Sequence, residues 1–252
     1  MDAVVRPVIR GQGTSEAEWS RWPALAQLPR IDAGTLVPRS ARAVVVAPHP
    51  DDEVLSVGGL LAQLADDGAR VEVIAVTDGT ASHEGSTEWP AERLASERPR
   101  ESRLALQRLG LDAEPVRLGL PDGGLSAMRG TLAARLVSLL RPRDVVFTTW
   151  RGDGHPDHEA TGQACALACA AAGARLVEVP VWGWHWSSPG DVRVPWAHAV
   201  RIDLDEQTVQ RKRSAVQAFA SQLRHDASTG APPVLRATTV ARARRPYEVV
   251  FL

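Results

Sequence analysis

Cysteine is scarce in this chain of 252 residues, and its placement excludes a disulfide framework. Only two occur, and Cys165 and Cys169 lie four apart on a predicted helix, a spacing poorly suited to a disulfide. We therefore expect both to be buried, small hydrophobic side chains. Nothing in the cysteine usage indicates an oxidising compartment.

Long apolar runs and an excess of either charge are also missing. No segment approaches the ~20 apolar residues of a membrane-spanning helix, and the N-terminus, with Asp2 and Arg6, lacks the apolar stretch of a signal peptide. We therefore expect a cytoplasmic protein without a membrane span. The formal net charge is −1, although Lys212 is the only lysine, so no overall field favours nucleic acid or an acidic membrane as a partner.

Strand-like and helix-like segments alternate through most of the chain, which is long enough for one large α/β domain. Apolar runs predict strands at residues 42–48, 71–77, 115–119, 144–150 and 175–181. Helical spacing of apolar residues and terminal stop signals predict helices at residues 54–68, 92–109, 130–140 and 158–172. This order predicts a Rossmann-like three-layer α/β sandwich with a mainly parallel sheet and helices on both faces.

The two ends of the chain are less regular. Residues 1–40 show no clear period, and they either wrap around the domain or are partly mobile. Beyond the fifth strand, a Trp-rich loop, a helix near 205–223 and a final strand near 246–251 follow. We therefore predict a single domain with an N-terminal extension, a core over residues 42–223 and a C-terminal extension over residues 224–252.

Two dense groups of reactive side chains follow predicted strands. His49-Pro50-Asp51-Asp52-Glu53 comes after the first strand, and Gly154-His155-Pro156-Asp157-His158-Glu159 comes after the fourth. Ligands bind beyond the carboxyl ends of the strands in open α/β sheets, so we expect both groups to meet at one active site. Burying so much charge is costly without a cation, and the two groups therefore predict one divalent metal site.

The residue types fit a catalytic metal centre. Such a zinc site takes three protein ligands and keeps a position for water, and His49, Asp52 and His158 fit this count. Asp51 then remains free beside the metal, and His155 lies on its other side. The same ligand types also suit Fe²⁺, Mn²⁺ and Co²⁺.

Together the two motifs resemble the PIG-L/LmbE-like family of zinc-dependent N-deacetylases. The resemblance covers roughly residues 42–223, and its further features are Thr77-Asp78-Gly79, Arg98, Glu101, Ala105, Leu109-Gly110, Leu118-Gly119, Asp122-Gly123, Lys212 and Ser221-Gln222. It implies Zn²⁺ as the cofactor and a hydrolase that removes an N-acetyl group from an amino sugar. The implied partner is a small-molecule N-acyl amino sugar or glycoconjugate, and whether the chain forms a homo-oligomer stays open.

The resemblance also implies a role for each residue of the two motifs. Three correspond to the family's metal ligands: His49, Asp52 and His158. Asp51 corresponds to the general base, and His155, oriented by Asp157 and protonated, polarises the acyl carbonyl. Either Asp51 or His155 protonates the leaving amine. Glu53 and Asp78 are expected to support these groups from behind.

Four residues are candidate substrate contacts: Arg98, Asp122, Trp184 and His185. Each has a structural alternative, because Arg98 lies on a charged helix, Asp122 in a turn, and the tryptophans can instead cover the end of the sheet. Some thiol-pathway members of the family carry a tyrosine two residues before His155, where this chain has Asp153. That departure leaves the substrate open.

Two other functions compete with a deacetylase. One is an amidase that cleaves a larger acyl group from a thiol or glycopeptide conjugate. The other, of a different class, is a non-catalytic Rossmann-like binding module. The first turn lacks the Gly-x-Gly-x-x-Gly phosphate cradle and offers carboxylates in its place, which disfavours nucleotide binding.

Overall fold

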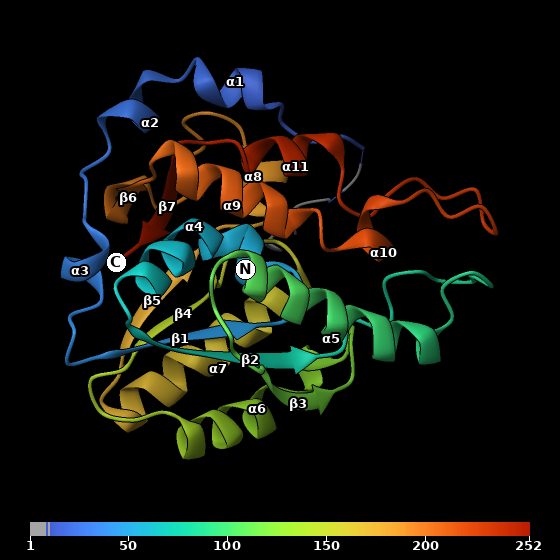
Figure 1. Ribbon diagram of the computed structural model, residues 1–252, viewed down its shortest axis with the longest axis horizontal. Helices are drawn as coiled ribbons and strands as arrows, with labels where there is room; N and C mark the ends of the chain where they lie inside the picture. Colours follow the sequence, from blue (N-terminus) through green and yellow to red (C-terminus); the bar gives the residue numbers. More distant parts are fainter. Residues whose placement is uncertain (1–8, 10) are drawn as a thin grey trace, which may run out of the picture.

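An inner strand of the sheet is buried on both faces, as a layered architecture requires. All six residues of β1 (Arg42–Ala47) are buried in the computed structural model, which describes residue 9 and residues 11–252. Within that part of the chain, seven strands form one sheet in the order β3-β2-β1-β4-β5-β7-β6 (Figure 1). The other strands are β2 (Arg70–Thr77), β3 (Val116–Leu120), β4 (Val145–Thr149), β5 (Arg175–Val179), β6 (Ala199–Asp203) and β7 (Tyr247–Phe251).

The first five strands are parallel, and the last two run antiparallel at one edge. Helices cover both faces, as the alternating pattern predicts. One face packs against α4 (Asp52–Asp66), with α5 (Ala91–Arg108) and α9 (Glu206–Val216) beside it; the other packs against α6 (Leu125–Leu139) and α7 (Pro156–Ala172) (Figure 1). The predicted three-layer α/β sandwich with a mainly parallel sheet is therefore confirmed.

The N-terminal extension wraps around the domain over its described residues. It contains α1 (Glu16–Ser20), α2 (Pro23–Gln27) and α3 (Ala33–Leu36). Ser15 and Glu18 form a capping box that starts α1. Trp19 is fully buried, and its indole Nε1 donates to Trp184 O at 3.0 Å. Residues 1–8 and 10 lie outside the described part of the chain.

Several short elements differ from the sequence-based expectation. The helix predicted from residue 130 begins at Leu125, and the helix predicted over 205–223 is divided into α9 and α10 (Ala220–Leu223). Phe219, fully buried between them, has φ −79° and ψ 61°, which is not helical. The elements α8 (Gly183–Trp186), η1 (Trp196–His198), β6 and α11 (Ala237–Arg242) were not predicted, because each is only three to six residues long.

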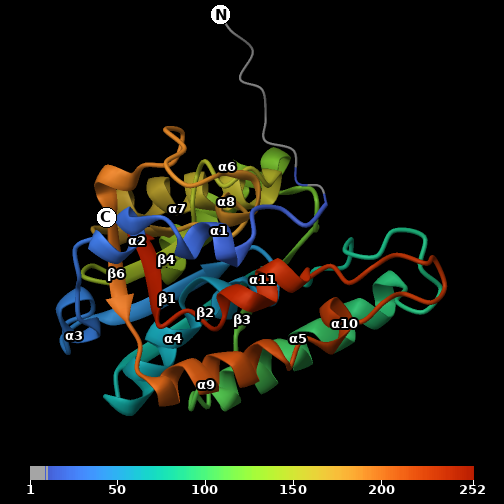
Figure 2. The same cartoon turned by 90° about the horizontal axis from the view of Figure 1, so that it is seen from above.

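Two long loops lie side by side at one end of the molecule (Figures 1 and 2). They are residues 78–90, after β2, and residues 224–236, after α10. The Ser228 hydroxyl accepts the Thr87 N–H at 3.1 Å and contacts Ser86 Oγ at 3.2 Å, which fastens one loop to the other. These loops therefore form a joint rim beyond the carboxyl end of the sheet.

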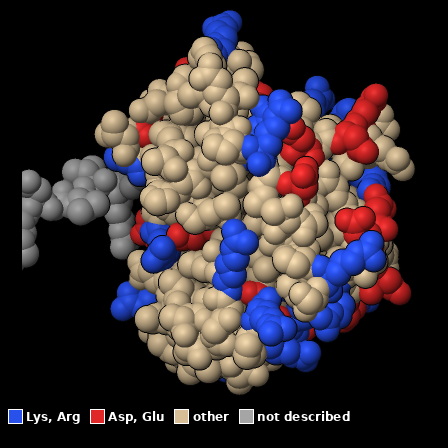
Figure 3. All heavy atoms as spheres, turned by 90° about the vertical axis from the view of Figure 1, so that its left-hand side faces the viewer, with Lys and Arg blue, Asp and Glu red and all other residues tan. Residues whose placement is uncertain are grey.

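Charged side chains of both signs lie on the surface (Figure 3), as the near-zero net charge predicts. Basic and acidic side chains intermingle over the face shown in Figure 3, in keeping with a formal net charge of −1. No helix in the described part of the chain is both long and apolar enough to cross a membrane.

Candidate metal-dependent active site

The turn between β1 and α4 holds its central residue in an unusual backbone conformation. Asp51, the residue before α4, has φ 133°, a region that a non-glycine residue rarely occupies. Such strain costs about 1–3 kcal/mol and persists only where the surroundings impose it. Glu53 accepts the Asp51 N–H at 2.9 Å, and Arg98 donates to Pro50 O at 2.6 Å. The contact with Asp51 fits the predicted supporting role of Glu53. The other carboxylate oxygen of Glu53 accepts the Ser102 hydroxyl.

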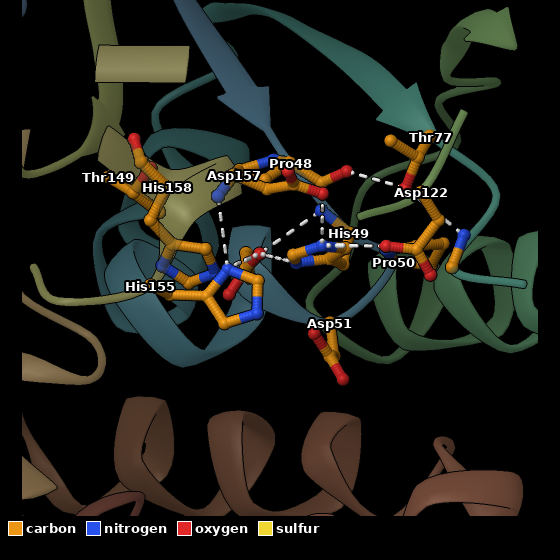
Figure 4. Close-up of polar contacts among 12 residues, drawn as sticks. Pro48, His49, Pro50, Asp51, Thr77, Asp122, Thr149, His155, Asp157 and His158 are labelled. Atoms are coloured by element: carbon orange, nitrogen blue, oxygen red, sulfur yellow. Dashed lines mark hydrogen bonds and ion pairs between the residues drawn. The ribbon is translucent and has the colours of Figure 1, made fainter. Parts of the chain in front are cut away.

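Three donor atoms from the two motifs converge at one point (Figure 4). Asp52 Oδ2 lies 3.2 Å from His49 Nδ1 and 3.2 Å from His158 Nε2. His158 is fully buried, and its Nε2 has no hydrogen-bond partner despite that distance. An unsatisfied imidazole nitrogen aimed at a carboxylate and a second imidazole fits a divalent ion. The expected ligand set is therefore together in space.

The charges around this point also fit a cation. Burial alone would lower the pKa of His158, but the carboxylates of Asp52 and Asp153 outweigh it and raise that pKa to about 9. Burial is likewise outweighed at His49, whose pKa is raised well above its usual value by Asp122, Asp157 and Asp52. In the metal-free protein, protons on the two imidazoles therefore balance the charge of the carboxylates. A bound metal ion would take the place of these protons.

The carboxylates of Asp122 and Asp157 both contact His49, although we expected Asp122 to contact the substrate and Asp157 to orient His155. Asp122 Oδ1 lies 3.1 Å and Asp157 Oδ2 lies 3.4 Å from His49 Nε2 (Figure 4), whereas Asp52 Oδ2 lies near the other ring nitrogen, Nδ1. Backbone N–H groups of Ala81, Gly123 and Leu125 hold the two carboxylates in place. A neutral imidazole that donates from Nε2 presents a lone pair at Nδ1, so this arrangement would leave Nδ1 of His49 able to bind a metal ion.

Asp157 contacts His155, as predicted, but through its backbone, while its carboxylate faces His49. Asp157 acts on that ring through its backbone N–H, which donates to His155 Nδ1 at 3.3 Å. The His155 ring proton is therefore placed on Nε2. Burial, with the charges of His158 and His49, lowers the pKa of His155 to about 3, so this ring is neutral at physiological pH.

Arg98 contacts the general-base candidate directly. Its guanidinium is 3% exposed and donates to Asp51 Oδ2 at 3.1 Å and to Gly79 O at 2.9 Å. Gly79 is required for this approach, because a Cβ there would lie 1.9 Å from the guanidinium, and its φ is +67°. Arg98 was expected to contact substrate; these hydrogen bonds hold Asp51 and the neighbouring turns in place.

A cavity of about 230 Å³ opens over the three converging atoms. Its lining includes the candidate catalytic side chains, Gln222 of the family resemblance, and residues that sequence reasoning did not select: Leu55, Ser82, Val181, Trp182 and Leu235. A second cavity of about 360 Å³ shares Ser82, Trp182 and Val234 with the first. The two therefore adjoin, and the half-buried Trp182 forms a wall of both.

Two further expectations on the site need correction, and one is met in part. Trp184 is 7% exposed and packs edge-on against Trp19, with ring centroids 4.9 Å apart, so it belongs to the core. Asp78 pairs with Arg117 at 2.7 Å, away from the metal ligands. His185 is buried and lines the outer cavity rather than the inner one. Trp182, the one tryptophan that faces the inner cavity, has no sequence feature that separates it from Trp184 and Trp186.

Asp153 was also missed as a part of the site. It lies between β4 and α7, is fully buried and accepts the His158 Nδ1–H at 2.7 Å. The only sequence signal was its place two residues before His155. A buried carboxylate beside a metal-binding imidazole is a common arrangement in zinc proteins.

Known proteins resemble this chain in sequence and in fold. A family profile described as PIG-L, GlcNAc-PI de-N-acetylase, matches residues 44–169, half of the chain. A 1D-myo-inositol 2-acetamido-2-deoxy-alpha-D-glucopyranoside deacetylase of Rhodococcus jostii (strain RHA1) is 28% identical, over 72% of this chain and 82% of that protein. A deacetylase of the same name from Mycobacterium sp. (strain KMS) is 30% identical, over 71% of this chain and 65% of that protein.

Solved structures also resemble this chain in fold. The conserved protein TT1542 from Thermus thermophilus has a TM-score of 0.53 and 31% identity, over 73% of this chain and 80% of that one. The zinc-inhibited form of teicoplanin deacetylase Orf2 shares the fold, with a TM-score of 0.60 and 23% identity over 84% and 97% of the two chains. This chain therefore belongs to the PIG-L family of deacetylases.

Proposed function

We propose that the protein is a metal-dependent N-deacetylase that hydrolyses the acetamide of an N-acetylated amino sugar carried in a glycoside. The single observation that carries this proposal is the convergence of His49 Nδ1, Asp52 Oδ2 and His158 Nε2 in one cavity with Asp51 and His155. Family membership and the names of the relatives support the same chemistry.

The three converging atoms would hold the metal, and Zn²⁺ is the expected ion. When bound, zinc supplies a Lewis acid and lowers the pKa of water from 15.7 to about 7. Fe²⁺, Mn²⁺ or Co²⁺ would suit the same imidazole and carboxylate donors. Asp122 and Asp157 keep His49 in the required tautomer through its Nε2.

Asp51 would accept the proton of the attacking water. Burial raises the pKa of its carboxyl, an effect that Arg98 partly opposes. A carboxylate whose pKa approaches neutrality is a better base than an exposed aspartate and still ionises at physiological pH. Arg98 and Glu53 fix its side chain and backbone, so the base does not have to be ordered during the reaction.

His155 would donate its Nε2–H to the acyl oxygen as a neutral imidazole. Its Nδ1 accepts the Asp157 N–H, and its pKa is low, so the protonated ring expected from the sequence is not needed. A neutral imidazole is a very weak acid. Asp51, once protonated, is therefore the better group to deliver a proton to the leaving amine.

The two cavities support a substrate with a second group beyond the sugar. The inner cavity, at about 230 Å³, is smaller than the roughly 300–1,000 Å³ of typical ligand sites, so it suits one N-acetylated ring. The adjoining space of about 360 Å³ would take the group to which the sugar is linked. The half-buried Trp182 offers an aromatic face to both parts. This inner volume gives no support to an amidase for larger acyl groups.

Amine release from a panel of substrates tests this function. The panel holds N-acetylglucosaminyl-inositol, diacetylchitobiose, an N-acetylated glycopeptide and a larger N-acyl thiol conjugate, each with chelated and metal-reloaded enzyme. We expect metal-dependent release from the N-acetyl glycosides, lost in His158→Ala and kept in the control His198→Ala, which alters an exposed histidine. No metal-dependent release from any member would contradict the proposal.

A further inference from the structure

The buried Asp153 carboxylate uses its full capacity to accept hydrogen bonds. The side chain is fully buried, and four N–H groups donate to it. One comes from the His158 ring, whose Nδ1 lies 2.7 Å from Oδ2. The other three are successive backbone amides, Val181 at 2.8 Å, Trp182 at 2.9 Å and Gly183 at 2.8 Å. One carboxylate therefore joins two parts of the active site.

On one side, Asp153 determines which nitrogen of His158 is available. A neutral imidazole has one N–H, and the 2.7 Å contact to Oδ2 places it on Nδ1. Nε2, which points toward Asp52, then carries the lone pair that a metal requires. The negative charge of the carboxylate also makes that lone pair more basic. Without it, His158 is free to turn or to take the other tautomer.

On the other side, Asp153 anchors the turn that follows β5. Val181 and Trp182 line the inner cavity, and their amides end at the carboxylate rather than in a sheet or helix. The Trp186 indole adds a bond of 2.8 Å to the Asp153 backbone oxygen. The position of the Trp182 ring, which lies nearly parallel to that of His155 at 6.3 Å, thus depends on the same residue.

We propose that Asp153 is a positioning residue that sets the tautomer of the metal ligand His158 and simultaneously places the aromatic wall formed by Trp182. The proposal rests on the metal-binding part of the proposed function. It couples metal affinity to substrate binding, because one buried carboxylate supports both. Asp153 touches neither the substrate nor the metal itself.

Asp153→Asn tests the proposal, since the amide keeps the shape but cannot accept all four N–H groups. We expect Zn²⁺ affinity, measured by competition with a chromophoric chelator, to fall by roughly 10- to 100-fold. The visible spectrum of the Co²⁺-loaded variant should change, and KM at saturating metal should rise more than kcat falls. The matched control is Asp144→Asn, equally buried at the other end of β4 and bonded to Arg42, which should lose stability but keep its metal affinity.

A second measurement does not depend on folding of the variant. In zinc-loaded wild-type protein labelled with ¹⁵N-histidine, His158 should show a protonated Nδ1 and a metal-bound Nε2. An unprotonated Nδ1 would overturn the proposal, as would equal metal affinity and an unchanged Co²⁺ spectrum in Asp153→Asn. A wild-type protein that binds no divalent metal would overturn the proposed function as well, so the two failures are distinguishable.

Discussion

The buried ion pair of Lys212 and Glu248 offers a stability prediction whose size follows from the structure. Helix α4, which carries Asp52 in its first turn, is kinked at Val57, where φ is −130°. Glu248 accepts the N–H groups of Gly59 at 2.6 Å and Leu60 at 2.8 Å, just past the kink. Lys212 contacts Glu248 and donates to Leu55 O at 3.3 Å, just before it. The pair therefore replaces helix hydrogen bonds that the kink removes.

Lys212→Met should destabilise the protein by about 3 kcal/mol. Removing one partner of a buried pair costs about 3–5 kcal/mol, because the other charge is left uncompensated. The Lys212 and Glu248 side chains are only 7% and 2% exposed, so water cannot replace the lost ammonium. Two backbone donors remain on the carboxylate, which places the cost at the lower end of that range.

Urea denaturation of the metal-free protein measures this loss. The control is Arg103→Met, which breaks a pair with Glu114 whose side chains are 50% and 63% exposed, and it should cost about 0–1 kcal/mol. The double variant of Lys212→Met with Glu248→Gln should lose less than the sum of the two single variants. A loss below about 1 kcal/mol in Lys212→Met would refute the reasoning from burial.

Three further predictions address the site and the core. In the metal-free protein the pKa of His158 is about 9, above its usual 6.5, so its stabilisation is complete below pH 6.5 and is lost as the pH rises through about 9. Metal binding near neutral pH should therefore release protons, which calorimetry in buffers of different ionisation enthalpy detects; no release would contradict the site's electrostatics. Gly79→Ala should displace Arg98 and lower kcat with metal retained, while Gly85→Ala, with the same backbone strain but no contact within 4 Å, should stay active; equal activity of both would remove this role from Arg98. Both cysteines are buried and have raised thiol pKa values, so neither should react with a disulfide reagent until urea is added, and rapid reaction of the folded protein would exclude this packing.

The layers of the fold and its mainly parallel sheet were predictable because buried parallel strands appear in the sequence as continuous apolar runs. Val44, Val45 and Val46 are all buried, one after another, since helices cover both faces of β1. The edge strand β6 escaped prediction because only two of its five residues are buried and two others, Arg201 and Asp203, are charged. Short helices such as α8 and α11 have too few turns to show a period.

That His49, Asp52 and His158 lie together was predictable from residue type and position, but the hydrogen-bond partners of these candidate ligands were not. The spacing of the two motifs brings His49 and His158 to neighbouring strand ends, β1 and β4. Which carboxylate supports which imidazole depends on the directions in which side chains leave a turn. Asp157 lies one residue from His158 yet faces His49 across the sheet, and Asp153 faces His158. Sequence distance gave no guide to either contact.

The tryptophans show the same limit in the substrate region. Trp182 and Trp184 are two residues apart, but one faces the cavity and the other packs on Trp19 in the N-terminal extension. That extension has no helical period, so its packing partner was not predictable. The local sequence pattern therefore indicated an aromatic site but not which tryptophan forms it.

Activity and metal content of Asp51→Asn test the central claim most directly. The claim is that Asp51 moves the proton while His49, Asp52 and His158 hold the metal. Asp51→Asn should bind as much zinc as the wild-type protein, by elemental analysis, and release amine at least about 100-fold more slowly at saturating substrate. Full activity of the zinc-loaded variant would contradict the account.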